Sequence, residues 1–507
     1  MKKIFYSKII VLFAILFGIA ACNDKLHESP EDIDFSGGTD YTISDNMILP
    51  LIGSYARFND LQWEVFPLIS VRGDDVNAGG LGDQQPYADT DNYKYDNNYW
   101  MYNSVWLDLY NDIIAYYTEM EQIDLYKQAG ASSTLAAQYT AEVKTLNAFS
   151  LFQISRLWGS VLIPTSSDRA ELLSETVSTK DEVMQFISDQ MDEAIPNLPD
   201  MRPNQRQDIP GGVTKYTALA MKALANLEMK NYQAVADATG QIISSGKFTL
   251  DSDFYELFKI PGKLDDENIL EFQYSDFGQG SGESKSYLYA FFGPQNWTPA
   301  VAGSNGGWGF YEPSKKYIEF MLDRGETVRL ETSVIFTNRG IAELQADGYT
   351  SLPSFVTNTT RDGDVFDDYP RALFASGKHY LPSNQLISGR TSYGSNNNFR
   401  AIRYSEVLLM YAEALTQGAS GITITADQAV NLVRARAGMS ALSGVTNQQV
   451  MDEKFAELAM EWGIRYFDMI RLGNTSELSY DGRTFTEDKA YLPYPQTQID
   501  QLPNLSN

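Results

Sequence analysis

Apolar side chains recur at three- and four-residue intervals through much of this chain, which is the spacing of one buried face of an α-helix. The first such stretch covers residues 47–58. Two longer stripes follow, formed by Trp106, Tyr110, Ile113 and Tyr117 and then by Tyr139, Val143, Leu146, Phe149 and Phe152. The pattern predicts a mainly α-helical protein.

A pair of adjacent helices is predicted in the middle of the chain. Residues 214–229 are rich in alanine, a turn follows at Lys230-Asn231, and a second apolar stripe covers 232–242. Small residues let two helices approach closely, so this segment resembles a tetratricopeptide unit. No strict repeat of about 34 residues is present, so further units of this kind are expected to be degenerate.

Helical signals return over residues 403–473 with clear start and stop residues. Two capping boxes mark helix N-termini, at Thr425 with Gln428 and at Thr446 with Gln449. Gly438 stands where a helix should end. The apolar stripe from Phe455 to Ile470 predicts one last helix that ends at Gly473.

Three regions have no helical period and are rich in turn-forming residues: 72–100, 275–312 and about 340–400. We predict that they form long loops on a rigid helical body, which is where function usually lies. The expected organisation is one globular domain over residues 47–507, with a helical half to about residue 260. The loop-rich part and the C-terminal helices follow from about residue 261.

The N-terminus has the features of a secretory signal. Three lysines precede an apolar run over 9–19, which is shorter than the roughly 20 residues of a membrane-spanning helix. Cys22, the single cysteine, follows Ala20-Ala21 and resembles the lipobox cysteine of bacterial lipoproteins. We therefore predict a signal peptide over 1–21, a lipid anchor at Cys22 and a tether over 22–46. The alternative is an ordinary signal peptide with an incidental cysteine.

Composition narrows the possible ligands. Without residues 1–21 the chain has 36 basic and 66 acidic residues, a net charge of about −30 that repels nucleic acid. Only two histidines are present, His27 and His379, which argues against a zinc centre or a Ser-His-Asp triad. The 31 tyrosines and the 13% aromatic content suit sugar binding, because aromatic rings stack on the apolar faces of sugars.

Several motifs together resemble the SusD/RagB family of surface lipoproteins. They are Ala141–Phe149 with Arg156–Gly159, Arg403–Ala414 with Asn431–Gly438, the series from Glu453 to Gly473, and Tyr491–Gln496. The similarity extends from the Cys22 motif to the C-terminus. One departure is Tyr117, where the family often has Asn.

This resemblance implies a mainly helical fold of tetratricopeptide-like pairs with long decorating loops. It also implies a function without catalysis: a lipid-anchored protein on the outer membrane, facing the cell exterior, that captures glycan for a SusC-like TonB-dependent transporter barrel. Two alternatives are a surface-anchored glycoside hydrolase and a peptide-binding uptake protein of the RagB type.

Aromatic residues outside the helical stripes suggest where a glycan would bind. We predict the site where the 72–100 region meets the 280–310 region, with Trp297 and Trp308 as stacking platforms or, alternatively, as packing anchors of their loops. Further candidate contacts are Arg72, Asp75, Asn77, Tyr99 and Trp100.

Charged residues elsewhere suggest structure more than chemistry. Glu453, Glu457, Glu461 and Arg465 follow one another at four-residue spacing, which predicts a Glu461–Arg465 ion pair on one helix face. Arg403, Glu406, Glu413, Arg434 and Arg436 are expected to bridge neighbouring helices. No cofactor is expected. Calcium at Asp74-Asp75 with Asp83, or at Arg361–Asp364, is the alternative to solvated acidic turns.

Overall fold

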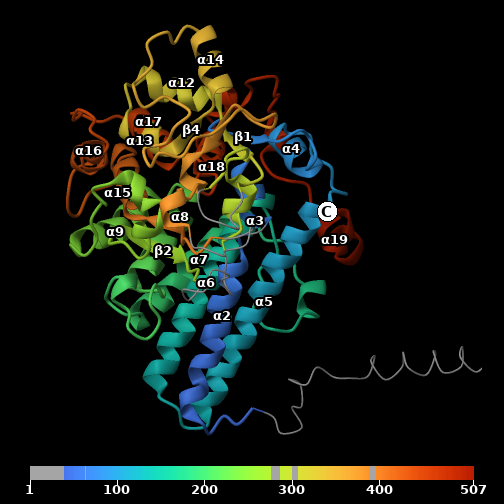
Figure 1. The fold of residues 1–507 in the computed structure, drawn as a ribbon. Coiled ribbons are helices and arrows are strands. Elements are labelled where there is room, and N and C mark those ends of the chain that lie inside the picture. The colour runs from blue at the N-terminus through green and yellow to red at the C-terminus, as the bar shows by residue number, and fades with distance from the viewer. Residues whose placement is uncertain (1–38, 63, 276–285, 300–305, 387–394, 507) are drawn as a thin grey trace, which may run out of the picture.

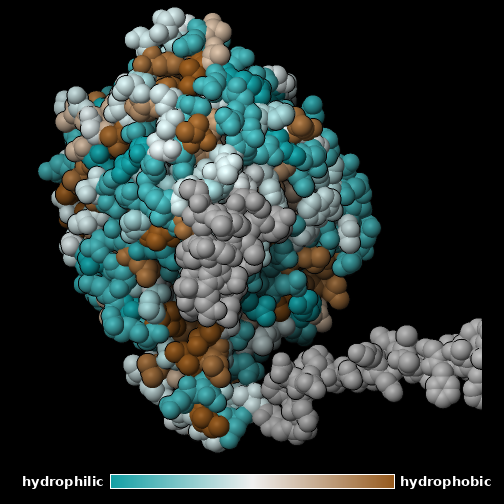
Figure 2. Space-filling view, in the orientation of Figure 1, coloured by the Kyte–Doolittle hydropathy of each residue, from teal (hydrophilic) through white to brown (hydrophobic). Residues whose placement is uncertain are grey.

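The computed structural model describes residues 39–506, except residue 63 and the segments 276–285, 300–305 and 387–394. The predicted signal peptide and Cys22 lie outside the described residues, as does the tether up to residue 38. No helix among the described residues is both long and apolar enough to cross a membrane. The face drawn in Figure 2 is largely hydrophilic, with hydrophobic residues confined to small patches.

Three long helices run side by side in the lower part of the molecule (Figure 1). They are α2 (Ile48–Asp60), α5 (Trp100–Gln128) and α6 (Ser133–Trp158). The predicted stripes face their common core, where Trp106, Ile113 and Phe149 are buried. The sequence prediction of these three helices is confirmed.

Helical pairs continue from this group. α6 packs on α7 (Lys180–Ala194), and each next helix packs on the one before it: α8 (Lys215–Glu228), α9 (Tyr232–Ser244), α15 (Tyr404–Thr416) and α16 (Ala426–Arg436). The alanines of α8 at 218, 220, 223 and 225 are fully buried. Their small size allows the close approach that the sequence predicted, and the mainly helical fold is confirmed.

The regions predicted as long loops contain short strands. β1 (Val76–Gly79) pairs with β3 (Phe310–Pro313), β2 (Asn268–Phe272) with β6 (Phe399–Arg403), and β4 (Val334–Phe336) with β5 (Phe374–Ser376), all antiparallel. Each strand has three to five residues and a partner far away in the sequence. Local periodicity cannot reveal such pairs. The β1–β3 pair joins the 72–100 and 275–312 regions.

Short helices lie in these regions and in the connections beside them, and several of them surround β4 in the upper part of Figure 1. They are α3 (Val65–Ser70), α4 (Gln85–Asp91), α10 (Phe254–Leu257), α11 (Leu288–Phe292), α12 (Lys315–Asp323), α13 (Val328–Ser333), α14 (Asn338–Ala346) and α19 (Gln496–Gln501). The loop prediction was therefore too coarse, although these regions do lack long helices.

The predicted last helix is divided into α17 (Asn447–Leu458) and α18 (Ile464–Leu472), so that prediction was wrong. Met460, Trp462 and Gly463 between them have positive φ values, which end an α-helix. The N–H of Met460 donates to the Asp75 carboxylate at 2.6 Å instead of to a helical carbonyl. A Cβ on Gly463 would lie 2.5 Å from the carbonyl oxygen of Ile69, so glycine is needed there. Both predicted capping boxes are present.

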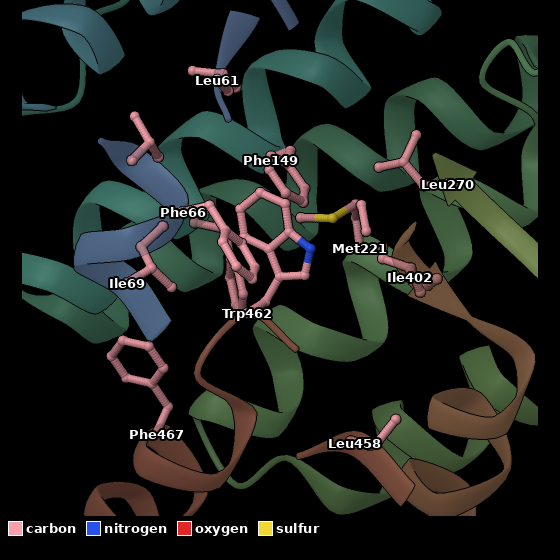
Figure 3. Packing of buried hydrophobic residues seen from close by; sticks show 14 of the residues in the cluster. Leu61, Phe66, Ile69, Phe149, Met221, Leu270, Ile402, Leu458, Trp462 and Phe467 are labelled. Atoms are coloured by element: carbon pink, nitrogen blue, oxygen red, sulfur yellow. The ribbon is translucent and has the colours of Figure 1, made fainter. Parts of the chain in front are cut away.

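This break places Trp462 in the centre of the core (Figure 3). Its ring lies 4.9 Å from that of Phe66, 5.2 Å from that of Phe149 and 5.3 Å from that of Phe272. The indole N–H donates to the carbonyl of Arg400 at 3.0 Å, so the buried polar atom has a partner. Residues from four distant parts of the chain are thereby fixed to one another.

Buried ion pairs hold the C-terminal helices together, as the sequence predicted, but with other partners. Arg403 pairs with Glu267, Glu457 and Glu461, while Glu453 pairs with Arg329 and Arg434. Burial alone would raise the pKa of Glu457, yet Arg436, Arg403 and Arg329 outweigh it and lower that pKa to about 2. The predicted Glu461–Arg465 pair is absent, because the helix is broken between them and Arg465 binds Asp74 at 2.7 Å.

Candidate functional site

Two of the predicted sugar contacts lie inside the protein. The side chain of Arg72 is 0% exposed, and its guanidinium lies 4.5 Å above the ring of Tyr466. Asp75 is also buried and accepts the N–H of Met460. The prediction of Arg72 and Asp75 as ligand contacts is therefore corrected: both hold the core around the α17–α18 break.

Trp297 is a packing anchor, which corrects its prediction as a stacking platform. The residue is 7% exposed. Its ring lies 5.0 Å from that of Phe366 and 5.6 Å from that of Tyr380, within a small second core. A ring that stacks on a sugar needs one face open to solvent. Trp297 is covered by its neighbours and has no such face.

Asn77 and Tyr99 are half-buried and bonded within the protein. The Asn77 side-chain oxygen accepts from Arg483 at 2.9 Å, and the Tyr99 hydroxyl donates to Asp89. Trp100 differs from both, since it is 52% exposed at the first residue of α5. Trp100 therefore keeps a ring surface that a ligand can reach.

The predicted meeting point of two loop regions lies next to a large surface cleft of about 960 Å³. We call it the α2–α5 cleft, because the end of α2, the turn into α3 and the middle of α5 form most of its wall. Its lining residues are Arg57, Asp60, Leu61, Gln62, Val65, Asp108, Asn111, Asp112, Tyr287 and Trp308. Trp308 is the one residue of the predicted set among them.

The aromatic wall of the cleft is held by hydrogen bonds to other elements. The backbone N–H of Trp308 donates to the backbone carbonyl of Ala290 at 2.6 Å. The indole ring of Trp308 lies 6.3 Å from the ring of Phe291. Tyr287 is 38% exposed, and its N–H donates to the side-chain oxygen of Gln62 at 2.6 Å. The backbone that carries each ring is thus held in place, which lowers the entropy lost when a ligand orders this wall.

The polar wall carries more acid than base. Arg57 lies 3.8 Å from Asp112 and 3.9 Å from Glu119. Burial, with Glu64 nearby, raises the pKa of Asp108 to about 6. Burial raises the pKa of Asp112 to about 7, helped by Asp108 and Asp60 and opposed by Arg57. Asp112 is half-buried beside Arg57, whereas Asp108 is exposed to solvent and forms no ion pair among the described residues.

This arrangement of helices is found in proteins of known structure. The surface glycan-binding protein A from Bacteroides thetaiotaomicron, in complex with laminarihexaose, superimposes with a TM-score of 0.72 at 24% identity over 91% of this chain and 98% of that one. A laminarin-binding SusD-like protein gives a TM-score of 0.75 at 20% identity, covering 90% and 97% of the two chains.

Sequence comparison agrees with the fold. A SusD-like protein of Bacteroides ovatus is 21% identical over 491 residues, which cover 93% of this chain and 83% of the relative. Residues 266–507 match the model of the SusD family. Over its C-terminal half the chain is similar to proteins of the SusD family. Its family resemblance, noted first in short motifs, thus extends through the C-terminal half and the whole fold.

The polar residues of the cleft were missed from sequence, although one signal was present. Asp108 and Asp112 are four residues apart on the face of α5 opposite the stripe of Trp106, Tyr110 and Ile113. Like charges at this spacing destabilise a helix by about 0.2–0.5 kcal/mol. Two aspartates that destabilise the helix, on the face opposite its buried stripe, indicate a role other than stability.

In the two acidic segments considered for calcium, Asp74, Asp83, Asp362 and Asp364 bind other protein groups. Asp74 pairs with Arg465 and Lys316, and Asp83 pairs with Arg371. In the second run Asp362 accepts from Asn384 at 3.0 Å, and Asp364 accepts the N–H of Ser383 at 2.9 Å. Among the described residues, no group of three or more acidic, histidine or cysteine side chains is arranged to hold a metal ion.

Proposed function

We propose that this protein binds a glycan in the α2–α5 cleft. The observation that carries the proposal is the combination of Trp308 and Tyr287 on one wall with Asp108 and Asn111 on the other. Flat aromatic rings stack on the apolar faces of sugars, while carboxylates and amides bond to the hydroxyl groups. A cleft of this size that combines aromatic and polar side chains suits a small-molecule ligand.

The same proposal places the protein at the cell surface. The lipobox-like Cys22 would carry the lipid that holds the protein on the outer membrane, with the folded body facing outwards. A SusC-like TonB-dependent barrel would receive the glycan. The likeness to the glycan-binding protein that was solved with laminarihexaose supports the ligand class.

Binding without catalysis is part of the proposal. Inverting and retaining glycosidases place two carboxyl groups on opposite sides of the bond that they cleave. Asp108 and Asp112, the cleft carboxyls whose pKa values rise furthest, are instead one turn apart on the same helix. Release of new reducing ends from a bound glycan would favour the hydrolase alternative.

A matched pair of tryptophan variants tests the site. Trp308→Leu keeps an apolar side chain in the cleft but removes the flat ring, and we expect glycan affinity to fall by about 10-fold or more. Trp297→Leu makes the same change in the second core, where stability should fall while affinity stays near the wild-type value. Isothermal titration with a glycan selected from an array gives both affinities. Equal affinities for Trp308→Leu and the wild type would contradict the proposed site.

A further inference from the structure

The α2–α5 cleft has an uneven charge. Three carboxylates line it, Asp60 from α2 and Asp108 and Asp112 from α5. Arg57 is the single cationic residue among its described lining residues. The described residues of the facing wall, Trp308, Tyr287 and Gln62, have neutral side chains. Arg169 reaches the edge of the cleft, where it donates to the side-chain oxygen of Asn111 at 2.9 Å.

The positive charge of Arg57 is shared. Asp112 lies 3.8 Å from its guanidinium, and Glu119 lies 3.9 Å away, just outside the lining. The remaining carboxylates, Asp60 and Asp108, form no ion pair within the described part of the chain. Glu64 adds a further acid beside Asp108. A ligand in this cleft therefore meets a negative field.

We propose that the α2–α5 cleft selects a neutral glycan and rejects one that carries carboxylate or sulfate groups. This inference rests on the proposed function and names the class of its substrate. Hydroxyl groups of a neutral sugar can donate to the aspartates, and hydrogen bonds to a charged acceptor are stronger than neutral ones. An anionic substituent would be brought next to carboxylates that Arg57 cannot balance, and such like-charge contacts disfavour the wrong ligand.

The acidity of the cleft gives this selectivity a pH dependence. Within the part of the chain that the structure describes, the charged groups that face the cleft or its edge are Arg57 and Asp60 on α2, Glu64 in the turn, Asp108, Asp112 and Glu119 on α5, and Arg169, which donates to the Asn111 side chain. Burial raises the pKa of Asp108 to about 6 and that of Asp112 to about 7. Both aspartates are charged at pH 8 and largely protonated at pH 5. Rejection of anionic glycans is therefore expected to be stronger at pH 8.

A set of matched polysaccharides tests the proposal. The full chain, purified in detergent, is titrated with neutral β-glucans, mannans, galactans and xylans, each also as a carboxymethyl and a hydroxyethyl derivative. The hydroxyethyl form controls for the bulk of the substituent. For the polysaccharide that binds, we expect the carboxymethyl form to bind about 10-fold more weakly than the hydroxyethyl form at pH 8. At pH 5 this difference in affinity between the two forms should be smaller.

The double variant Asp108→Asn, Asp112→Asn assigns the effect to these residues. Asp108 is exposed and Asp112 is half-buried, so neither substitution changes a fully buried residue and the variant should fold. The difference in affinity between the carboxymethyl and hydroxyethyl forms should narrow to about 3-fold or less at pH 8. Asp124→Asn is the control, because Asp124 is an exposed α5 residue outside the cleft that pairs with Lys127.

The outcomes are distinct. A carboxymethyl form that binds as tightly as the hydroxyethyl form overturns the proposed selectivity and leaves glycan binding intact. A difference in affinity that stays unchanged in the double variant overturns its assignment to Asp108 and Asp112. If no neutral or charged polysaccharide binds, the proposed function fails, and the selectivity fails with it.

Discussion

Two groups of carboxylates in this protein have opposite surroundings. In the buried network of Arg403, Arg329, Glu453, Glu457 and Glu461, each glutamate bonds to at least one cation. Among the described lining residues of the α2–α5 cleft, there are three aspartates and one arginine, and only Asp112 pairs with it. Pairing lowers the pKa of Glu457 to about 2, whereas desolvation without enough pairing raises that of Asp112 to about 7.

The difference separates carboxylates that hold the fold from those available to a ligand. Glu453 and Glu457 on α17 show the same four-residue spacing in sequence as Asp108 and Asp112 on α5. The balance of charge around each group distinguishes them, and that balance is set by residues far away in the chain, such as Arg329 and Arg403. An acid whose pKa is raised in a cleft is a better guide to function than an acid whose pKa is lowered in the core.

Removing one buried glutamate should give the largest effect. Glu457→Gln leaves Arg403, Arg436 and Arg329 without a shared counter-charge in the core. Breaking a buried ion pair costs about 3–5 kcal/mol, so the free energy of unfolding should fall by about that amount in urea denaturation. Glycan affinity of the folded variant should stay near the wild-type value.

The control for Glu457→Gln is Asp124→Asn, which breaks an exposed pair and should cost less than about 1 kcal/mol. The wild-type contribution of Glu457 should also disappear with acid. Because its folded pKa is lowered, the stabilisation is present above the unfolded value and is lost as the pH falls from about 4.5 towards 2. If Glu457→Gln had normal stability but no longer bound glycan, Glu457 would belong to the ligand site and not to the carboxylates that hold the fold.

Local patterns in the sequence predicted much of the helical body. Apolar stripes predicted α5 and α6, and capping boxes predicted the starts of α16 and α17, because each signal lies within a few residues of the structure that it specifies. The division between α17 and α18 was missed, since it depends on Asp75 and Ile69, which are almost 400 residues away from it in sequence.

The candidate site was predicted less well for the same reason. Trp308 and Trp100 remain plausible ligand contacts, because each keeps an accessible ring. Arg72, Asp75 and Trp297 had the composition of a binding site, but long-range packing buries them. Residue type alone cannot show whether an arginine or a tryptophan in an irregular segment faces solvent or a second core.

A smaller effect is expected from Asp112→Asn, and its sign is opposite to that of Glu457→Gln. The folded pKa of Asp112 lies above the unfolded value of about 3.8, so its charge destabilises the folded state above pH 7. That cost is relieved as the pH falls from about 7 towards 4. We expect Asp112→Asn to be more stable than the wild type by about 1–2 kcal/mol at pH 8 and similar to it at pH 4.

Thermal unfolding at the two pH values measures this difference, and Asp124→Asn again provides an exposed aspartate for comparison. A loss of stability at pH 8 in Asp112→Asn would mean that the ion pair with Arg57 outweighs desolvation. The contrast between the cleft and the buried network would then be smaller than we infer.

The smallest effect concerns the length of the bound glycan. Trp100, Asp108 and Asn111 share the solvent-facing side of α5, and the eight residues from Trp100 to Asp108 span about 12 Å of helix. We propose that a long glycan leaves the cleft along this face and stacks on Trp100. Trp100→Leu should weaken binding of a hexasaccharide by about 3- to 5-fold, the contribution of one exposed ring, and leave binding of a trisaccharide unchanged. Leu432→Ser, which alters an exposed apolar residue on α16, should change neither affinity. Titration of both oligosaccharides decides the matter, because an equal loss for the two lengths would place Trp100 in the cleft itself, and no loss for either would end the glycan before this residue.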